Sequence, residues 1–545
     1  MKLSLIETAT KKTNNGLSIT DVMSLFGVSS ATVRNWIKLG YLASGKKGFV
    51  TSDSVEHFSH EIAGKEKLVA RANKSRKDRN SEMPNMGVPF SLDRENDQSV
   101  GESYESSLSE SYRNKEGIFY TPEHIVKDMM LPMEVSKDGL FLDPCCGSGN
   151  FLVEAVRRGV KPECIYGFDT DENAVKIAKY RIKKETGYDS QNIICGDFLT
   201  LCQQLPQKFD YIFTNPPWGK KIIKEDKAKF SKIYHCGNST DTSSLFFAAC
   251  LSVLRDHGSM GFLLPEAFFN IGVFEDIRAK ALENRIVLIK DYGKPFKGLL
   301  TKACSIIINK AAPKPDDTII CNASGITHLR KQISIAGIPK KVFNYWLTEE
   351  ESDIIQAAYR IPHTTLKENT RWGLGIVTGN NTQKCKKYYG AGLKPIYRGQ
   401  DINPEKVCES GLYIDENLKE CQQVAPLSMY NAPEKLIYRF ISSNLVFYCD
   451  TEQRYILNSA NMIVLGANFP LTGSQLASLL NSRFMNWLFK SLFCTHKVLR
   501  GDLELLPVFL DYWDDLGNFD EKALLNQLNI CYKDGTYRVK SSIAA

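Results

Sequence analysis

Between residues 115 and 310, short apolar runs alternate with stretches in which apolar and polar residues recur at helical spacing. The apolar runs predict seven strands, at residues 139–143, 164–169, 192–197, 209–214, 259–264, 286–291 and 303–309. Amphipathic stretches between them predict helices, among them 150–158, 172–184 and 243–254. This alternation indicates an α/β domain with a doubly wound, mostly parallel sheet. In such sheets ligands bind at the carboxyl ends of strands, so residues there are the first site candidates.

The N-terminal segment carries a second, smaller pattern. Residues 17–42 predict two short helices around a turn at Gly27, with Thr20 as the N-cap of the first helix. The pattern resembles the helix-turn-helix of MerR and excisionase-like proteins, in which Arg34 and Lys38 would lie on the outer face and contact DNA. Small three-helix packings that do not bind DNA share this pattern, so both interpretations stay open.

Changes in composition predict the domain boundaries. Residues 71–103 are polar with mixed charge, which favours a linker with little fixed structure. Beyond residue 335 the patterning is mixed, with a strand expected at 435–440 and a helix at 474–489. The predicted division is a helical domain, a polar linker, an α/β domain and a C-terminal α+β domain, at residues 1–70, 71–103, 104–335 and 336–545.

The bulk composition is that of a globular protein. At 545 residues, with 43% hydrophobic and 24% charged residues, the chain is long enough for two or three domains. It has no apolar run of about 18 residues that would predict a membrane span, and its N-terminus lacks the apolar core of a signal peptide. Its 15 cysteines include no C-x-x-C pair, so we expect a reducing cytoplasm and no zinc site.

The net charge of +7 lies at the N-terminus. Residues 1–80 hold 14 Lys and Arg against 7 Asp and Glu, which leaves the rest of the chain neutral overall. A local excess of positive charge attracts phosphates. The charge therefore favours nucleic acid as a partner of this segment, with a solvated basic face as the alternative.

The most informative motif is Asn215-Pro216-Pro217-Trp218, at the end of the predicted strand 209–214. An amino group conjugated to a ring is a poor nucleophile because its lone pair is delocalised. The Asn215 side-chain oxygen and the Pro216 carbonyl can accept its two hydrogens and free that lone pair. The two prolines stiffen the loop, and Trp218 offers a flat face for stacking a base. A surface turn is the alternative interpretation.

A glycine loop follows the first predicted strand. The strand ends at Asp143, and the loop contains Gly147 and Gly149 before the predicted helix 150–158. Glycines let the backbone turn tightly and approach a ligand closely. The loop lacks the Gly-Lys-Ser/Thr sequence that an ATP phosphate site requires. A ligand with a cationic centre and no phosphates, such as S-adenosylmethionine, fits it better, with Asp143 near the methionine ammonium group.

Two further acids end the next two predicted strands. Asp169 stands where an acidic residue binds ribose hydroxyls in related folds. Asp197 could accept from an adenine amino group while Phe198 flanks the ring. A helix N-cap is the alternative role for each aspartate. Three strand-terminal aspartates in series favour a cofactor site.

In this order the motifs resemble those of the γ-type adenine-N6 DNA methyltransferases of restriction–modification systems, with a TaqI-like organisation. Residues 117–122 match the family's cofactor-capping segment, and 261–265 and 295–298 match later strand-end motifs. The resemblance is strong over residues 115–310 and looser over 375–507, where it suggests a TaqI-like specificity domain. The N-terminal helix-turn-helix lies outside the family's basic plan.

The resemblance implies a site-specific enzyme that methylates adenine N6 in double-stranded DNA with S-adenosylmethionine and no metal. Thr121 and Pro217 would contact the cofactor, and Phe296 and Trp218 would stack on an adenine flipped out of the duplex. The family is bacterial or archaeal and usually works beside a separately encoded restriction endonuclease. An extruded base costs a few kcal/mol of stacking, which the pocket must recover.

Basic residues near the motifs are DNA-binding candidates. Lys220 and Lys221 directly follow Trp218 and would clamp the target strand, with a solvated loop as the alternative. Arg398 lies in a basic and aromatic segment of the specificity region, a pattern that suits contact with phosphates and bases.

Several other functions compete with this interpretation. A cytosine-C5 enzyme is rejected because Cys145-Cys146 lies in the glycine loop and not in a catalytic loop. Cytosine-N4 enzymes usually carry Ser in place of Asn215. RNA and protein-glutamine methyltransferases share Asn-Pro-Pro-aromatic motifs, but they do not require the C-terminal region. A fused nuclease lacks a persuasive carboxylate–lysine set, and a DNA-binding regulator with an inactive methylase fold would not need the intact Asp and Asn series.

Overall fold

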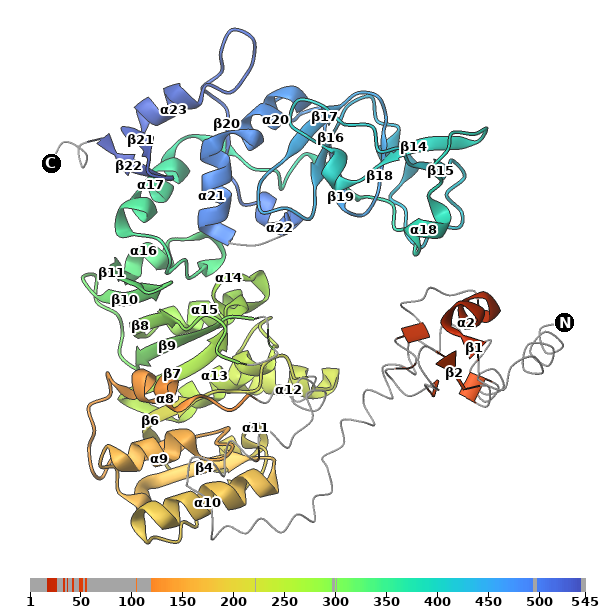
Figure 1. Ribbon diagram of the computed structural model, residues 1–545. Helices are drawn as coiled ribbons and strands as arrows, with labels where there is room; N and C mark the ends of the chain where they lie inside the picture. The colour runs from red at the N-terminus through yellow and green to blue at the C-terminus, as the bar shows by residue number, and fades with distance from the viewer. Residues whose placement is uncertain are drawn as a thin grey trace. The chain divides into compact units, whose positions relative to one another are not determined.

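The computed structural model describes residues 17–26, 33–34, 37, 42–43, 49–51, 54–55, 104, 119–220, 222–296, 299, 301–493 and 497–540 (Figure 1). It divides into two compact units, Met1–Tyr120 with Pro217–Lys221, and Thr121–Pro216 with Ile222–Ala545. The predicted turn at Gly27, the linker 71–103, Lys38 and Lys221 lie outside the described residues.

The N-terminal unit contains a small core around one helix. Strands β1 (Leu17–Ser18) and β2 (Phe49–Val50) pair antiparallel beside helix α2 (Ile19–Phe26). The buried core residues are Leu17, Val22, Val33, Leu42, Val50 and Val55. Val33, Arg34 and Ile37 are helical, as the predicted second helix requires. The helix-turn-helix as a whole stays a prediction.

The first helix begins two residues earlier than predicted. Thr20 lies inside α2, so its assignment as the N-cap is wrong. The Asp21 N–H donates to the Ser18 hydroxyl at 3.1 Å, and the Ser18 N–H donates to the Asp21 carboxylate at 3.0 Å. This reciprocal pair is a capping box. The hydrogen bonds from Ser18 lower the pKa of Asp21.

The second unit is built on one large mixed sheet. Its strand order is β11-β10-β8-β9-β7-β6-β3-β4-β5. In chain order the strands are β3 (Phe141–Asp143), β4 (Ile165–Asp169), β5 (Ile193–Cys195), β6 (Phe209–Thr214), β7 (Leu254–Pro265), β8 (Arg285–Asp291), β9 (Ala303–Asn309), β10 (Thr318–Ala323) and β11 (Ile326–Lys331). The seven predicted strands are all present, and the pairs from β5 to β7 are parallel.

The sheet has nine strands, so the predicted number of seven is wrong. The hairpin of β10 and β11 extends the sheet, with β10 parallel to β8 and antiparallel to β11. Apolar residues on this hairpin are exposed: Ile320 is 41% exposed and its cross-strand partner Leu329 is 60% exposed. An apolar pattern that does not separate buried from exposed positions gives a weak strand signal.

Helices pack against the sheet in groups. They are α8 (Glu123–Met130), α9 (Asn150–Arg157), α10 (Glu172–Thr186), α11 (Phe198–Leu201), α12 (Lys224–Tyr234), α13 (Thr242–Val253), α14 (Ala267–Asn270), α15 (Glu275–Leu282) and α16 (Gln332–Ala336), with short 3-10 turns η1 (Pro162–Cys164), η2 (Cys202–Gln204), η3 (Gly272–Phe274) and η4 (Pro339–Lys341). Helices α9 and α10 contact each other and β4, whereas α13 contacts β7 and α15 contacts β8. The predicted α/β architecture is therefore confirmed.

The C-terminal part of this unit is α+β, as predicted. Its helices are α17 (Glu349–Arg360), α18 (Asn381–Lys384), α19 (Leu427–Tyr430), α20 (Gly473–Asn481), α21 (Arg483–Phe493), α22 (Arg500–Leu503) and α23 (Glu521–Gln527), with the 3-10 turn η5 (Gly399–Asp401). Its strands are β12 (His363–Thr364), β13 (Thr370–Leu374), β14 (Leu393–Tyr397), β15 (Tyr413–Asp415), β16 (Lys435–Arg439), β17 (Phe447–Asp450), β18 (Tyr455–Ile456), β19 (Ala460–Leu465), β20 (Val508–Phe509), β21 (Ile530–Lys533) and β22 (Thr536–Val539). The largest sheet has the order β13-β19-β16-β17, and β16 is the predicted strand at 435–440.

The single helix predicted at 474–489 is wrong, because it is two helices that meet at Ser482. Ser482 has φ −58° and ψ 153°, which ends α20. Its hydroxyl then accepts the Met485 N–H at 3.2 Å in the first turn of α21. A serine competes with the helix for backbone hydrogen bonds and favours such caps.

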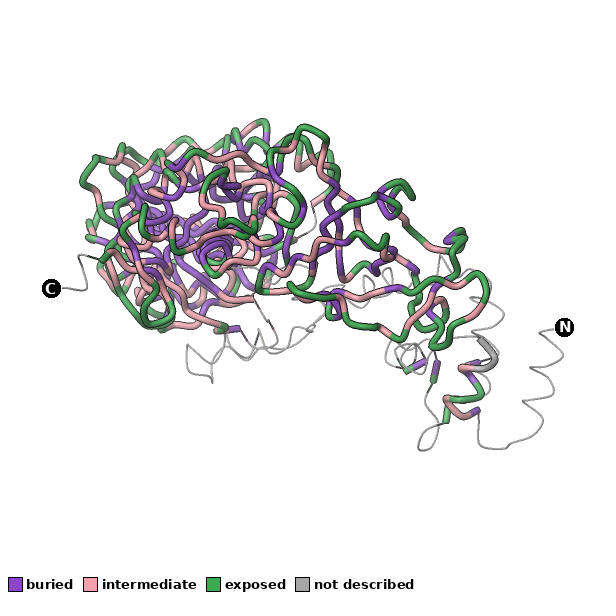
Figure 2. The backbone as a smooth tube through the Cα atoms, turned by 90° about the horizontal axis from the view of Figure 1, so that it is seen from above, coloured by how far each residue is buried: buried purple, intermediate pink, exposed green. Residues whose placement is uncertain are grey.

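Buried residues group into separate cores, shown as purple stretches in Figure 2. One core lies on the large sheet with α13 and α15, and another lies among α17, α20 and α21. Trp346 packs against both cores. Among the described residues, every helix is too short or too polar to cross a bilayer.

A buried arginine joins the two parts of this unit. Arg278 on α15 is fully buried and donates to the carbonyls of Phe268, Ile271, Lys340 and Lys341 at 2.7 to 2.8 Å. Burial lowers the pKa of Arg278 to about 10. Lys340 and Lys341 have φ of 54° and 51°, a left-handed bend that the two hydrogen bonds to their carbonyls hold in place.

Candidate active site

The carboxyl edge of the parallel strands brings the predicted motifs together. Asp143 pairs in register with Gly167, and Asp169 pairs with Cys195. Leu142 pairs with Ile212, so the strand end before Asn215 lies beside the strand end at Asp143. Strand termini that share an edge form the crevice in which such sheets bind ligands.

Two glycines shape the loop between β3 and α9. Gly147 has φ 49°, and its N–H donates to the Asp169 carboxylate at 2.9 Å. Gly149 has φ 88° and precedes α9, and a Cβ built on it would lie 3.0 Å from the Ala178 Cβ. Gly149 is therefore required both for its left-handed conformation and for the close approach of α10.

Asp143 is held inside the protein. It is 1% exposed, and its Oδ1 accepts from the Cys145 N–H at 3.1 Å and from the Thr214 hydroxyl at 2.6 Å. Burial raises the pKa of Asp143 to about 7, against the lowering effect of the two hydrogen bonds, and the charge of Asp169 adds to the rise. These contacts tie the glycine loop to the strand that carries Asn215.

The sequence did not indicate this role of Thr214. Its side chain is fully buried at the end of β6, one residue before Asn215. A threonine in an apolar strand is an ordinary β-former, so nothing local distinguishes it. Only the neighbouring position of β3 shows that its hydroxyl meets a carboxylate.

The other two aspartates differ in their contacts. Asp169 accepts from the N–H groups of Gly147 and Asp171, both at 2.9 Å. Asp197 is exposed and caps α11, since it accepts from the Leu199 N–H at 3.2 Å and from the Thr200 hydroxyl at 2.7 Å. The helix-cap interpretation thus describes Asp197 in this structure, whereas Asp169 orients the glycine loop.

Phe198 lies in the core. It is 1% exposed, and its ring centroid is 5.5 Å from that of Phe168 and 6.0 Å from that of Phe246. The ring is thereby packed against two protein aromatics. Its predicted contact with an adenine ring would need a rearrangement of this cluster.

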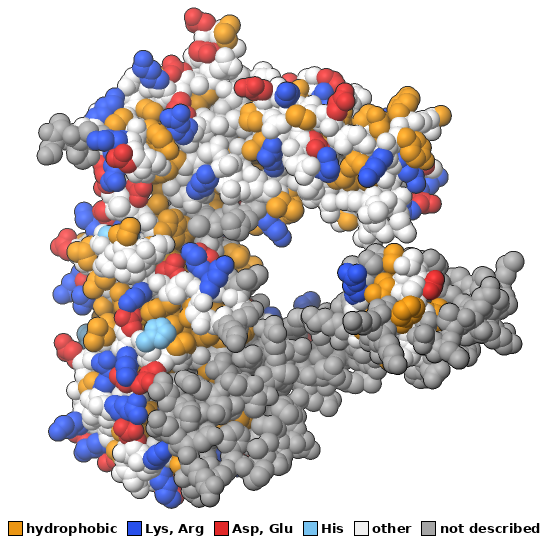
Figure 3. Space-filling view, in the orientation of Figure 1, with side chains coloured by type: hydrophobic (Ala, Val, Ile, Leu, Met, Phe, Trp, Pro, Cys, Tyr) orange, Lys and Arg blue, Asp and Glu red, His pale blue; other side chains and the backbone are white. Residues whose placement is uncertain are grey.

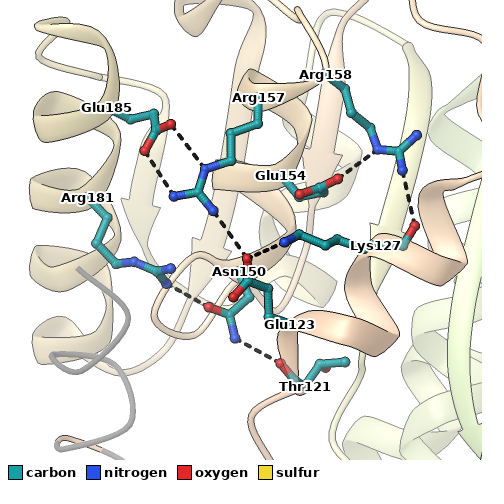
Figure 4. Close-up of polar contacts among 9 residues, drawn as sticks. All are labelled: Thr121, Glu123, Lys127, Asn150, Glu154, Arg157, Arg158, Arg181 and Glu185. Atoms are coloured by element: carbon teal, nitrogen blue, oxygen red, sulfur yellow. Dashed lines mark hydrogen bonds and ion pairs between the residues drawn. The ribbon is translucent and has the colours of Figure 1, made fainter. Parts of the chain in front are cut away.

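A polar network fixes Thr121 beside the glycine loop (Figure 4). The Asn150 side-chain N–H donates to the Thr121 carbonyl at 2.8 Å, and its Oδ1 accepts from Arg181 at 2.7 Å. Arg181 is 5% exposed and also donates to the Ser148 carbonyl at 2.8 Å. Asn150 and Arg181 thus position the predicted cofactor-capping segment and the loop together.

Sequence reasoning missed both residues. Asn150 is the first residue of α9, where a polar residue is common, and Arg181 belongs to a basic amphipathic helix whose cations usually face solvent. The signal that could have revealed Arg181 is its place on the buried face of α10, between Ala178 and Ile182.

Ion pairs surround this network on the surface. Glu123 pairs with Lys127 at 2.7 Å, and Arg157 pairs with Glu185 at 3.0 Å. The hydrogen bond from Lys127 lowers the pKa of Glu123, and that from Arg157 lowers the pKa of Glu185. Exposed pairs contribute little each, about 0–1 kcal/mol, but together they hold α8, α9 and α10 in one arrangement.

The residues of the Asn215–Trp218 motif are assigned to different units. Asn215 is half-buried and Pro216 is buried in the second unit, directly after β6. Pro217 and Trp218 belong to the N-terminal unit, where the Trp218 ring is 9% exposed and lies 6.2 Å from the ring of Phe119. Gly219 follows with φ 66°, which ends the motif in a turn.

Phe296 lies on an anchored loop after β8. The Asp291 carboxylate accepts the Gly293 N–H at 2.6 Å, and the Tyr292 hydroxyl donates to Asp128 at 2.6 Å. Phe296 itself is 6% exposed. Stacking on a base would require its ring to become accessible, and its role stays a prediction.

The predicted DNA-binding residues occupy different environments. Arg34 is exposed and Lys220 is half-buried. Arg398 donates to the Asp401 carboxylate through two nitrogens, at 3.0 and 2.9 Å, and this pairing raises its pKa. Figure 3 shows Lys and Arg side chains interspersed with Asp and Glu on the visible face. Among the described residues, the structure has no cluster of three or more His, Cys, Asp or Glu side chains suited to a metal ion.

Comparisons with known proteins match this arrangement. Residues 95–354 match the family model described as N-6 DNA methylase, and residues 394–508 match the TaqI-like C-terminal specificity domain. The chain is 46% identical over 391 residues to the type II methyltransferase M.VspI of Vibrio sp. (strain 343), which covers 71% of this chain and 96% of that protein. The chain belongs to the N-6 DNA methylase family.

Two more distant proteins also align with the chain. The modification methylase CviBIII of Paramecium bursaria Chlorella virus NC1A is 26% identical over 216 residues, which cover 39% of this chain and 54% of that protein. A solved modification subunit of a putative type I restriction enzyme from Vibrio vulnificus YJ016 has a TM-score of 0.35 and 17% identity. It covers 58% of this chain, and the chain spans 62% of it.

The family assignment confirms the prediction of an N6-type DNA methyltransferase, and the match over residues 394–508 confirms the predicted TaqI-like specificity domain. This N-6 DNA methylase has the α/β fold expected for an S-adenosylmethionine-dependent methyltransferase. The roles of the individual site residues and the domain boundaries stay predictions.

Proposed function

We propose that this N-6 DNA methylase transfers a methyl group from S-adenosylmethionine to N6 of an adenine flipped out of double-stranded DNA. It would be the modification enzyme of a type II restriction–modification system whose endonuclease is encoded separately. The observation that carries the proposal is the position of Asn215 and Pro216 at the carboxyl end of β6, beside the glycine loop.

The described residues fit the cofactor. Gly147 and Gly149 bring backbone to the edge of the sheet, and Asp169 lies against Gly147. Carboxylates suit a sulfonium and an ammonium group, and the loop has no phosphate-binding lysine. Thr121, Pro217, Asp143, Asp197 and Phe198 complete the proposed set, with Asp143 acting through the loop because it is buried. When bound, the cofactor supplies an electrophilic methyl carbon.

The residues of the motif would prepare the target nitrogen. The Asn215 Oδ1 and the Pro216 carbonyl accept the two N6 hydrogens, so the nitrogen lone pair leaves conjugation with the ring and points at the methyl donor. Trp218 and Phe296 would hold the base between them. Transfer by this route needs positioning and electrostatic stabilisation but no covalent enzyme intermediate.

DNA contacts would come from several parts of the chain. Arg34 and Lys38 would serve the N-terminal domain, Lys220 and Lys221 the target strand, and Arg398 the specificity domain. Phosphate contacts by lysine and arginine release counterions, so binding should weaken steeply with salt. The proposed domains are those predicted from the sequence, at 1–70, 71–103, 104–335 and 336–545.

The proposal is tested by methyl transfer from labelled cofactor to duplex DNA, with identification of the methylated nucleoside by mass spectrometry. N6-methyladenine is the expected product. Methylated RNA or glutamine would favour the alternative N-methyltransferases, and DNA binding without methyl transfer would favour a regulator with an inactive fold.

A variant separates the chemistry from cofactor binding. Asn215→Ala removes the side-chain acceptor and should abolish turnover while the cofactor dissociation constant, measured by calorimetry, stays unchanged. Asn192→Ala is a matched control, since the Asn192 side chain donates to the Glu163 carbonyl at 3.0 Å on the exposed surface. Loss of cofactor affinity in Asn215→Ala would mean that its role is misassigned.

A further inference from the structure

The turn after β7 exposes two β-branched side chains. Ile271 is 42% exposed and Val273 is 60% exposed, on either side of Gly272. The neighbouring aromatics Phe268, Phe269 and Phe274 face the core and are at most 5% exposed. The 271–273 turn therefore presents apolar groups to solvent from a well-packed base.

The backbone of this turn is held rigidly. The buried guanidinium of Arg278 donates to the carbonyls of Phe268 and Ile271 at 2.7 and 2.8 Å. The Ile271 N–H donates to the Ala267 carbonyl at 3.0 Å, and the Phe274 N–H donates to the Ile271 carbonyl at 3.1 Å. β-Branched side chains are themselves stiff at χ1. A contact made by this turn would therefore cost little conformational entropy.

The turn lies at the same edge of the sheet as the candidate active site. Thr214, the last residue of β6, pairs with Phe262 on β7. Strand β7 continues to Pro265, and α14 leads from there to Ile271. The turn is thus separated from the strand end beside Asn215 by one short helix.

The turn also borders the TaqI-like specificity domain. A Cβ built on Gly272 would lie 3.5 Å from the Lys340 Cδ. The Lys340 ammonium group donates to the Gly501 carbonyl at 2.8 Å, in α22. The exposed apolar pair is therefore placed between the residues proposed for chemistry and the domain proposed to read DNA.

We propose that the 271–273 turn enters the base stack of the target duplex and fills the space that the flipped adenine leaves. This inference rests on the proposed function, since it assumes base extrusion. Neighbouring base pairs that lose a stacking partner expose apolar faces, and proteins that bend or open DNA often insert an apolar side chain there. The Ile271 and Val273 side chains meet that need without a polar group to desolvate.

The proposal is tested with Ile271→Ala/Val273→Ala in the full-length chain. Substrates are a duplex carrying the methylated site, mapped beforehand in DNA from an expressing host, and the same duplex with cytosine opposite the target adenine. A mismatched base is easier to extrude. On the paired duplex we expect kcat/KM to fall about tenfold or more relative to wild type, and on the mismatched duplex about threefold or less. Fluorescence of 2-aminopurine at the target position should fall in parallel on the paired duplex.

Two further variants control for folding and for general apolar exposure. Ile271→Leu/Val273→Ile keeps the apolar volume and should retain activity on both duplexes. Ile320→Ala/Leu329→Ala removes a comparably exposed apolar pair, 41% and 60% exposed, from the β10–β11 hairpin. That variant should match wild type on both duplexes, and cofactor affinity should be unchanged in all variants.

Unchanged kcat/KM of Ile271→Ala/Val273→Ala on the paired duplex, or an equal loss on both duplexes, would overturn the proposal. A loss in the Ile320→Ala/Leu329→Ala variant of the same size would also overturn it. If wild-type protein forms no N6-methyladenine on any duplex, the proposed function fails instead, which keeps the two failures distinct.

Discussion

Replacement of Thr214 by valine tests the link between the methylation motif and the glycine loop. Valine keeps the shape of the side chain but removes the hydroxyl that donates to the Asp143 Oδ1 at 2.6 Å. Both residues are at most 1% exposed, so water cannot replace the lost donor. The Cys145 N–H, at 3.1 Å, would be the donor left to that oxygen among the described contacts.

The stability lost in Thr214→Val depends on the charge of Asp143. A hydrogen bond to an ionised group contributes about 1.5–3 kcal/mol, whereas one between neutral groups contributes about 0.5–1.5 kcal/mol. The pKa of Asp143 is raised from 3.8 to about 7, so the carboxyl is mostly protonated at pH 5 and mostly ionised at pH 8. The variant should therefore lose about 1–2 kcal/mol more stability at pH 8 than at pH 5.

The direction in which stability changes with pH follows from proton linkage at Asp143. Because the folded state holds this proton more tightly than the unfolded state, burial of Asp143 costs no stability below its unfolded pKa of 3.8. The cost grows as pH rises toward about 7 and is complete above it. The hydrogen bond from Thr214 lowers the pKa of Asp143. Its loss therefore raises that pKa further and increases the stability lost at alkaline pH.

The assay is the difference in melting temperature between Thr214→Val and wild type, measured at both pH values. A change of 1 kcal/mol corresponds to about 2–4 °C for a domain of this size. Other titrating groups cancel in the difference, and Thr214→Ser, which retains the donor, should show a much smaller pH dependence. Equal losses at pH 5 and pH 8 would refute the role assigned to the Thr214 hydroxyl.

Three further predictions follow from described contacts. Gly149→Ala, which would place a methyl group 3.0 Å from Ala178 at φ 88°, should lower stability by about 1–3 kcal/mol in thermal unfolding. Asn150→Ala should weaken cofactor binding about tenfold in calorimetry, because a polar network at a site typically contributes at least 1.4 kcal/mol. Lys435→Met should lower stability by about 1.5–3 kcal/mol in thermal unfolding, because it removes a 2.6 Å charged hydrogen bond to the fully buried Asp450 and leaves Arg454, at 2.7 Å, as the ion-pair partner of that carboxylate.

Two of these variants have a matched control. Gly159→Ala also has positive φ, 101°, but no atom lies within 4 Å of a Cβ there, so a loss equal to that of Gly149→Ala would remove the steric argument. Lys161→Met breaks a 2.6 Å pair with Asp138 on the exposed surface and should leave the melting temperature nearly unchanged. If it costs as much as Lys435→Met, burial is not the cause. Unchanged cofactor affinity in Asn150→Ala would exclude the network around Thr121 from binding.

The sequence predicted strands β3 to β6 well because each is a short apolar run that an aspartate or the Asn-Pro-Pro motif follows or ends. Strands β6 and β9 coincide with their predicted ranges. The β10–β11 hairpin was missed because Ile320 and Leu329 face outward, which removes the contrast that marks a buried strand. The break at Ser482 was missed because its amphipathic flanks continue the same periodicity on both sides.

The candidate site was predictable where a motif is contiguous and hidden where a contact joins distant residues. Asn215 and the glycine loop can be identified from their residue types and spacing. Thr214 meets Asp143 across 71 positions, and Asn150 meets Thr121 across 29. Such contacts depend on which strand lies next to which, and a single sequence gives no pairing information.

Arg278 donates hydrogen bonds to carbonyls of both parts of its unit, and we call this set of bonds a clamp. The clamp bears on how such enzymes acquire new specificities. Two of its acceptors are main-chain carbonyls of Lys340 and Lys341, which every amino acid supplies, so the clamp does not depend on the side chains that follow it. These two hydrogen bonds can therefore persist when the side chains of the recognition module diverge, whereas Phe343, Tyr345 and Trp346 still have to fit the core of the large sheet. The positive φ at both positions sets the main restriction, because β-branched residues tolerate it poorly.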